Sequence, residues 1–169
     1  VQDRFKAPNV LFVIFTTVLV DLIGFGMVIP LVGLYGRHFG ASSFSLAILG
    51  GTFSLIQFLS APFWGLLSDR IGRRPVLLVS ILGQAASYFM FAAAGSIEML
   101  IACRALAGLF SGNISAAQAA VADVTSAKDR AKGMGIIGAA FGLGFTLGPP
   151  LGGIASAKLG LAAPGIIAG

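Results

Sequence analysis

Long apolar runs alternate with short polar breaks along the whole chain. Five runs are long enough to cross a membrane as helices, because about 20 apolar residues span a hydrocarbon core of roughly 30 Å. The breaks contain the Gly, Ser and Thr residues that are typical of loops, as at 40–43, 95–96 and 125–127. The predicted helices are 9–34, 43–67, 75–94, 97–121 and 133–157, with a sixth that starts near 161 and is cut off at Gly169.

The composition indicates the same class of protein. Hydrophobic residues make up 57% of the chain and charged residues 10%, whereas soluble domains carry about 25% charged residues. With a mean hydropathy of +0.96, a soluble fold would have too little polar surface. The 24 glycines suit membrane helices that pack closely. We therefore predict an all-α polytopic membrane protein in contact with the lipid bilayer.

The basic residues gather on one side of the predicted helices. The opposite side has only Arg37 and Lys158. Because short cytoplasmic loops are enriched in Lys and Arg, we expect the N-terminus and the two basic loops to be cytoplasmic, in the plasma (inner) membrane. Once these loops are assigned, no basic face is left for nucleic acid, so we expect no nucleic-acid partner. The residues on the basic side are Arg4 and Lys6, then Arg70, Arg73 and Arg74, then Lys128, Arg130 and Lys132.

Three short motifs follow one another along the chain. The first is the loop between the second and third predicted helices, which combines glycines, an acid and arginines. The second is an arginine inside the fourth helix, followed by a glycine four residues later. The third is a Gly/Pro pattern in the fifth helix. Their residues are Gly65, Asp69, Arg70, Gly72, Arg73 and Arg74; Arg104 and Gly108; and Gly144, Gly148, Pro149, Gly152 and Gly153.

Together the motifs resemble those of the major facilitator superfamily, and the chain is similar to the N-terminal half of its twelve-helix drug–proton antiporters. Residues 20–30 are most similar to the tetracycline–proton antiporters. The resemblance implies the major facilitator fold, with an N-terminal helix bundle of two inverted three-helix repeats. It also implies that a C-terminal half is missing here. Either the chain is part of a longer protein or a second chain supplies the rest, and we expect the first.

The charged loop is a candidate cytoplasmic gate. Asp69 can pair with Arg73 or Arg74, and glycines at Gly65 and Gly72 allow the backbone to turn and pack closely. The resemblance implies that this loop locks the two halves together, with Asp123 joining its charge network. The alternative is that the arginines only anchor the topology.

Asp21 is the candidate proton-coupling residue. It lies about 12 residues into the first helix, or roughly 18 Å at 1.5 Å per residue, near the bilayer midplane. A charge there costs on the order of 3 kcal/mol, so such residues usually face a cavity. Burial disfavours a charged carboxylate, which suits a group that takes up and releases a proton. We expect Asp21 to bind the coupling proton or a cationic substrate; the alternative is a structural acid bonded to a neighbouring helix.

Arg104 is the second charge inside a predicted helix. It lies roughly 10 Å deep by the same rise, shallow enough to extend toward the interface. The resemblance implies that this arginine influences proton transfer. We expect it to line the central cavity together with Asp21.

The fifth helix carries a packing motif. Gly144, Gly148 and Gly152 recur every four residues and form a flat face for another helix, and Pro149 and Pro150 should bend the chain. The resemblance implies that this helix packs against the opposite half and shapes closure of the carrier. The alternative is an ordinary tight helix contact.

Gln57, Phe25 and Asn113 are the candidate substrate-binding residues, because they place polar and aromatic groups in apolar helices. The stretch from Gln84 to Tyr88 has no acid where the tetracycline carriers typically have one. Tetracycline itself is therefore not assigned as the substrate.

We expect a secondary transporter that exports small amphipathic molecules or drugs in exchange for protons by alternating access, as in multidrug efflux and antibiotic resistance. The alternatives are a symporter or uniporter of the same fold, and a non-transporting membrane receptor or scaffold. No enzyme activity, metal or organic cofactor is expected, since His38 is the only histidine and no phosphate-binding loop is present. The proton is the expected coupling ion, and the small-molecule substrate and the C-terminal half are the expected partners.

Overall fold

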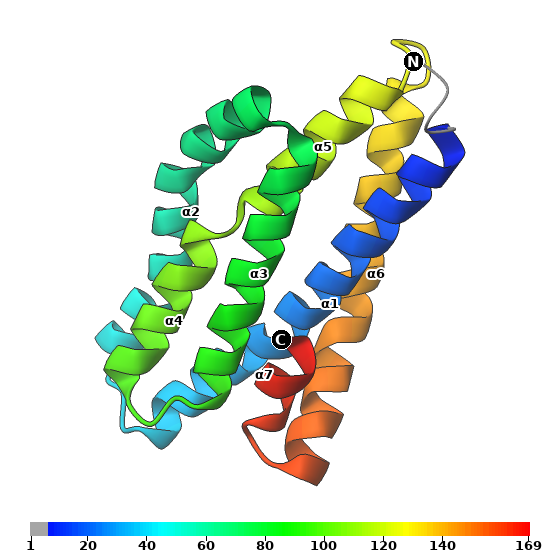
Figure 1. Cartoon of the computed structure of the whole chain (residues 1–169). Coiled ribbons are helices and arrows are strands. Elements are labelled where there is room, and N and C mark those ends of the chain that lie inside the picture. Colours follow the sequence, from blue (N-terminus) through cyan, green and yellow to red (C-terminus); the bar gives the residue numbers. More distant parts are fainter. Residues whose placement is uncertain (1–6) are drawn as a thin grey trace.

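The computed structural model describes residues 7–169, and within them it consists of helices joined by short loops (Figure 1). Five stretches are long and apolar enough to cross a membrane, with α4 and α5 counted together. The predicted all-helical membrane class is confirmed. The helices are α1 (Ala7–His38), α2 (Ser43–Ile71), α3 (Arg73–Ala92), α4 (Ile97–Leu109), α5 (Gly112–Val124), α6 (Arg130–Leu159) and α7 (Ala163–Ala168).

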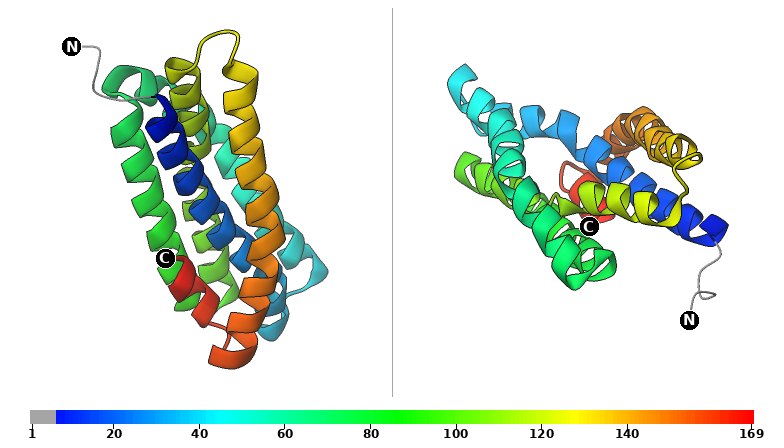
Figure 2. Two further views of the ribbon diagram at one scale, coloured as in Figure 1. Left: turned by 90° about the vertical axis from the view of Figure 1, so that its right-hand side faces the viewer. Right: turned by 90° about the horizontal axis from the view of Figure 1, so that it is seen from above.

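Helix α1 crosses the bundle diagonally and makes its most extensive contact with α6 (Figure 2). Helix α2 packs mainly on α4, and α3 contacts both α4 and α5. The short α7 packs against α1 and α3. The turn at Gly72 and the loop 125–129 lie at the same end of the bundle, at the top of Figure 1, and we call this the basic end.

The predicted helix 97–121 is in fact two helices, because the chain breaks at Phe110 and Ser111. The break leaves carbonyl groups without a helical partner, and side chains supply the donors. The hydroxyls of Ser60 and Ser111 donate to the Gly108 carbonyl at 3.1 and 2.7 Å, and the Trp64 indole N–H donates to the Leu109 carbonyl. Such a break is tolerated at membrane depth only where the freed backbone groups are satisfied.

Two clusters of apolar side chains hold α1 in place. Near the basic end, Val18 and Leu22 of α1 pack with Val121 of α5 and Ile137 of α6. Toward the other end, α1 packs against α3 and α4 through a second cluster that includes Phe91. Asp21 lies within the α1 stretch of the first cluster, directly before Leu22, so it is held between well-packed helices.

Candidate functional site

A cavity of about 300 Å³ lies inside the bundle, between α1, α2, α3, α5 and α6. It contains the predicted proton-coupling acid and the three predicted substrate-binding residues, so the fold brings these four together from three helices. Phe141 and Phe145 of α6 also line it. Its walls therefore combine phenylalanine rings with polar side chains, which suits a small amphipathic ligand. Its other lining residues include Asp21, Phe25, Phe53, Gln57, Gln84 and Asn113.

Asp21 is half-buried and forms no ion pair within residues 7–169. The buried Asn113 side chain stands beside its carboxyl group. The Asn113 Oδ1 atom accepts the Ile114 N–H at 2.9 Å, so the NH₂ group is the part of this amide that can donate to the carboxylate. Asp21 also lines a second cavity of about 360 Å³, which adjoins α1, α3 and the end of α7.

Arg104 is only 5% exposed and turns inward rather than extending toward an interface. Its guanidinium carbon lies 6.0 Å from the ring centre of Phe25 and 5.4 Å from that of Phe53. These are the distances of cation–π contacts. Among the described residues no acid lies within ion-pair distance, and the Nε atom has no hydrogen-bond partner. Arg104 thus stands behind two rings that form the cavity wall.

Gln84 lines both cavities. In the sequence it is notable only as part of a stretch that has no acid. It is 4% exposed. Its Nε2 group donates to the Tyr88 hydroxyl at 3.2 Å, while its Oε1 atom has no partner. A glutamine within an apolar run, four residues before a tyrosine, is the signal that could have identified it.

At the basic end, Arg73 joins three helices. Its Nε donates to Asp123 at 3.0 Å, and its NH1 donates to Asp69 at 2.6 Å and to the Ser68 hydroxyl at 3.1 Å. Gly72 alone forms the turn between α2 and α3, and its φ of +97° is one that favours glycine.

The other members of the predicted gate are less engaged. Arg70 and Arg74 are exposed and form no ion pair within the described residues. Gly65 lies inside α2 with open space beside it, so close packing is not its role within this chain. Arg4 and Lys6 of the predicted topology signal lie outside the described residues. The function of this loop as a gate stays a prediction.

The glycine face of α6 packs against α1. A Cβ atom on Gly148 would lie 2.7 Å from the Gly26 Cα atom, and one on Gly144 would collide with Leu22. Gly152 is equally close to the Met27 backbone. The glycine face of α6 is therefore occupied by α1. The expectation that α6 also packs against the opposite half stays a prediction. Gly153 faces open space, and α6 continues as a helix through Pro149.

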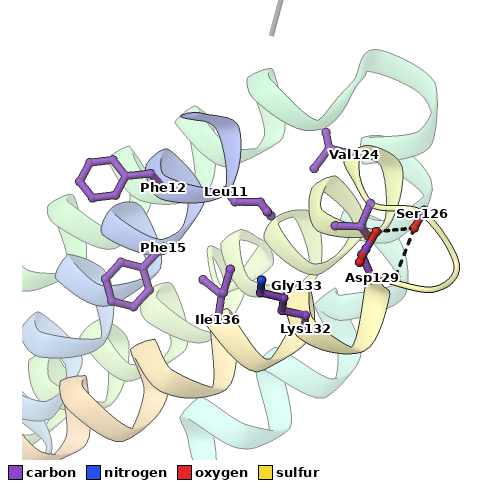
Figure 3. A pocket seen from close by; sticks show the side chains of 10 residues that line it. Leu11, Phe12, Phe15, Val124, Ser126, Asp129, Lys132, Gly133 and Ile136 are labelled. Carbon is purple, nitrogen blue, oxygen red and sulfur yellow. Dashed lines mark hydrogen bonds between the residues drawn. The ribbon is translucent and has the colours of Figure 1, made fainter. Parts of the chain in front are cut away.

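A further cavity, of about 510 Å³, lies at the basic end between α1, α6 and the loop that joins α5 to α6 (Figure 3). Phe12 and Phe15 form its apolar side. On its polar rim the Ser126 hydroxyl donates to Asp129 at 2.7 Å and accepts the Asp129 N–H at 3.2 Å. Its acid is thus exposed and bonded within its own loop, whereas Asp21 lies on the interior cavity.

Comparisons with known proteins identify the family of this fold. The profile of the Major Facilitator Superfamily matches residues 14–169. The Bos taurus protein named Major facilitator superfamily domain-containing protein 10 is 40% identical over 180 residues, covering 89% of this chain and 40% of that protein. The class C tetracycline resistance protein of Escherichia coli is 40% identical over 155 residues, covering 90% and 39%.

The crystal structure of the human organic anion transporter MFSD10 is similar to this fold, with a TM-score of 0.81 at 32% identity. The match covers 98% of this chain and 46% of that one. The chain therefore spans about 40% of the length of the curated relatives it matches.

Proposed function

Since this chain belongs to the major facilitator superfamily of membrane transporters, we propose that it supplies the N-terminal half of a carrier that exports small amphipathic molecules in exchange for protons. The observation that carries the proposal is the position of Asp21, a carboxyl group without an ion-pair partner among the described residues, on a cavity with aromatic walls. Such an intramembrane acid is by default a functional candidate. The E. coli relatives named as tetracycline resistance proteins support export as the direction of transport.

The proposed cycle needs only one carboxyl group that water reaches alternately from the two sides of the membrane. Protonation removes the charge of Asp21 while the carrier is open to the outside, and substrate leaves. Reopening to the inside lets the proton go, and the ionised carboxylate with its Asn113 neighbour restores a polar cavity for the next substrate molecule. Phe25 and Phe53 provide apolar contact area for the ring system of the substrate.

Arg104 favours one refinement of the substrate class. A guanidinium on the outer face of two wall rings makes the cavity less suitable for a cation and more suitable for a neutral or anionic molecule. One similar structure is titled a human organic anion transporter. An aromatic organic anion that places its charge toward this wall and away from the ionised Asp21 is therefore the second candidate substrate, beside a neutral amphipathic drug.

We also infer that the basic end is cytoplasmic and that the membrane is the plasma (inner) membrane. A cysteine placed at exposed Arg74 should then react with an impermeant thiol reagent only after the membrane is opened. Labelling of intact cells would contradict this orientation.

The function is tested with the full-length protein in liposomes that contain a pH-sensitive dye. Antiport moves protons against the direction of substrate, whereas a symporter moves them in the same direction and a scaffold moves neither. Asp21→Asn should abolish proton movement. Asp129→Asn removes an exposed acid outside the interior cavity and is the matched control. Proton-coupled export that survives Asp21→Asn would refute the proposal. Paired anionic and cationic dyes of one ring system then decide the substrate charge.

A further inference from the structure

One polar atom of the Gln84 side chain is buried and accepts no hydrogen bond from the described residues. The amide is 4% exposed, and its NH₂ group donates to the Tyr88 hydroxyl at 3.2 Å. The Oε1 atom has no hydrogen-bond partner within residues 7–169. A buried acceptor without a donor is costly, so such an atom calls for an explanation. A donor that is present only in one state of the protein is such an explanation.

Asp21 and Gln84 lie in the same region of the bundle. Helices α1 and α3 both run away from the basic end (Figure 1). A Cβ atom on Gly24 would lie 3.4 Å from the Tyr88 ring, so the two helices are in contact about one turn beyond Asp21 and Gln84. Both residues line both cavities, which places them on the same two surfaces.

The two amides beside Asp21 suit opposite protonation states. An ionised carboxylate only accepts hydrogen bonds, whereas a protonated one also has an O–H donor. The NH₂ group of Asn113 on α5, beside the carboxyl group, matches the ionised form. The unused oxygen of Gln84 on α3 matches the protonated form. We infer that Gln84 accepts a hydrogen bond from protonated Asp21, and that this positioning residue sets how tightly the carrier holds its proton. This inference rests on the proposed proton coupling.

Few other groups can titrate or carry charge near Asp21. Among the described residues, Tyr88 of α3 lines the second cavity with it, and Arg104 of α4 lies behind the cavity wall. The sides formed by α2, α5 and α6 carry amides and rings instead, namely Phe53 and Gln57, Asn113, and Phe141 and Phe145. A change at Gln84 leaves Arg104 in place and alters one acceptor near the carboxyl group.

The test is a pH titration of the full-length protein in liposomes, followed by infrared difference spectroscopy. A protonated carboxyl group has a C=O band, and the band that Asp21→Asn removes belongs to Asp21. Gln84→Met keeps the length of the side chain without the acceptor. It should move the midpoint of that band to lower pH by about one unit, since one hydrogen bond to the protonated form is lost. The frequency of the band should also rise, as expected for an unbonded acid.

Two further variants make the test specific. Asn113→Leu should move the midpoint the other way, to higher pH by about one unit, because the ionised form loses its donor. Ser80→Ala removes another buried α3 atom without a partner, one that lines neither cavity, and should leave the midpoint unchanged.

The outcomes separate the inference from the function it rests on. An Asp21 band that is the same in Gln84→Met and wild type overturns the inference and leaves proton coupling standing. Shifts in the same direction for Gln84→Met and Asn113→Leu also overturn it, because they report a general loosening. No Asp21 band at any pH overturns both. If Gln84→Met does not fold, Tyr88→Phe replaces it in the test. This variant removes the hydroxyl that holds the Gln84 amide in place, so the midpoint of the Asp21 band should fall by a smaller amount. An unchanged midpoint overturns the inference.

Discussion

Replacing Gly148 with alanine should separate α1 from α6. A Cβ atom at this position would lie 2.7 Å from the Gly26 Cα atom and 2.9 Å from the Ile23 carbonyl oxygen. Carbon atoms pack best at about 3.5–4.0 Å, so the new methyl group overlaps its neighbour by about 1 Å. Both obstacles are backbone atoms, which cannot rotate away. The two helices must therefore move apart along the most extensive contact in the bundle.

The magnitude follows from two opposing effects. Overpacking a tight interface costs about 1–3 kcal/mol. Alanine regains about 1 kcal/mol of helix propensity relative to glycine. Gly148→Ala should thus destabilise the protein by up to about 2 kcal/mol, whereas an alanine in open space should be neutral or stabilising. The difference between the two kinds of variant isolates the overpacking cost.

The assay is equilibrium unfolding of the full-length protein in mixed micelles. Gly138→Ala of α6 and Gly33→Ala of α1 are the controls, because a Cβ atom at either position meets nothing within 4 Å. We expect Gly148→Ala to unfold at lower denaturant than both. A Gly148→Ala protein as stable as the two controls would show that the close approach of α1 and α6 is wrong.

Three other predictions concern contacts between helices. Trp64→Phe removes the donor to the Leu109 carbonyl at the α4–α5 break and should cost about 1–3 kcal/mol in unfolding experiments, while exposed Phe63→Leu should cost little. Arg73→Ala breaks both ion pairs at the basic end and should cost about 0.2–1 kcal/mol per pair, an effect that shrinks at high salt, whereas Arg74→Ala should not depend on salt. Arg104→Leu should reduce transport of an anionic dye more than that of a cationic dye with the same rings, and equal losses would count against the substrate refinement.

The membrane class and most of the helices could be predicted because apolar length is the main requirement for crossing a bilayer. The break at Phe110 and Ser111 could not, because both residues sit inside an apolar run and hydropathy does not record whether backbone hydrogen bonds continue. The cluster Gly108, Ser111 and Gly112 was the available signal. It becomes meaningful only when Ser60 and Trp64 of another helix are seen to cap the freed carbonyls.

The candidate site could likewise be predicted from the sequence only in part. Asp21 stands out in sequence because a charge in an apolar helix needs a reason. The spacing of Gly144, Gly148 and Gly152 predicts a close contact but carries no information on its partner, which the structure identifies as α1. Gln84 is an ordinary polar residue in sequence, and only its burial and its unused oxygen mark it.

The break between α4 and α5 accounts for the composition of the cavity. In a continuous helix, the backbone groups near Phe110 would be hydrogen-bonded within the helix. The helix surface there would consist of apolar side chains. Because the chain restarts at Gly112, a helix N-terminus and the Asn113 amide lie at the cavity that Asp21 and Gln84 of α3 also line. The N-terminal end of a helix is electropositive, so this arrangement stabilises a negative charge there. The carboxyl group thus shares its cavity with one helix suited to its ionised form and with another that, by the inference above, suits its protonated form. In the proposed antiport cycle, a small relative movement of α3 and α5 would favour one form over the other and so link proton binding to alternating access.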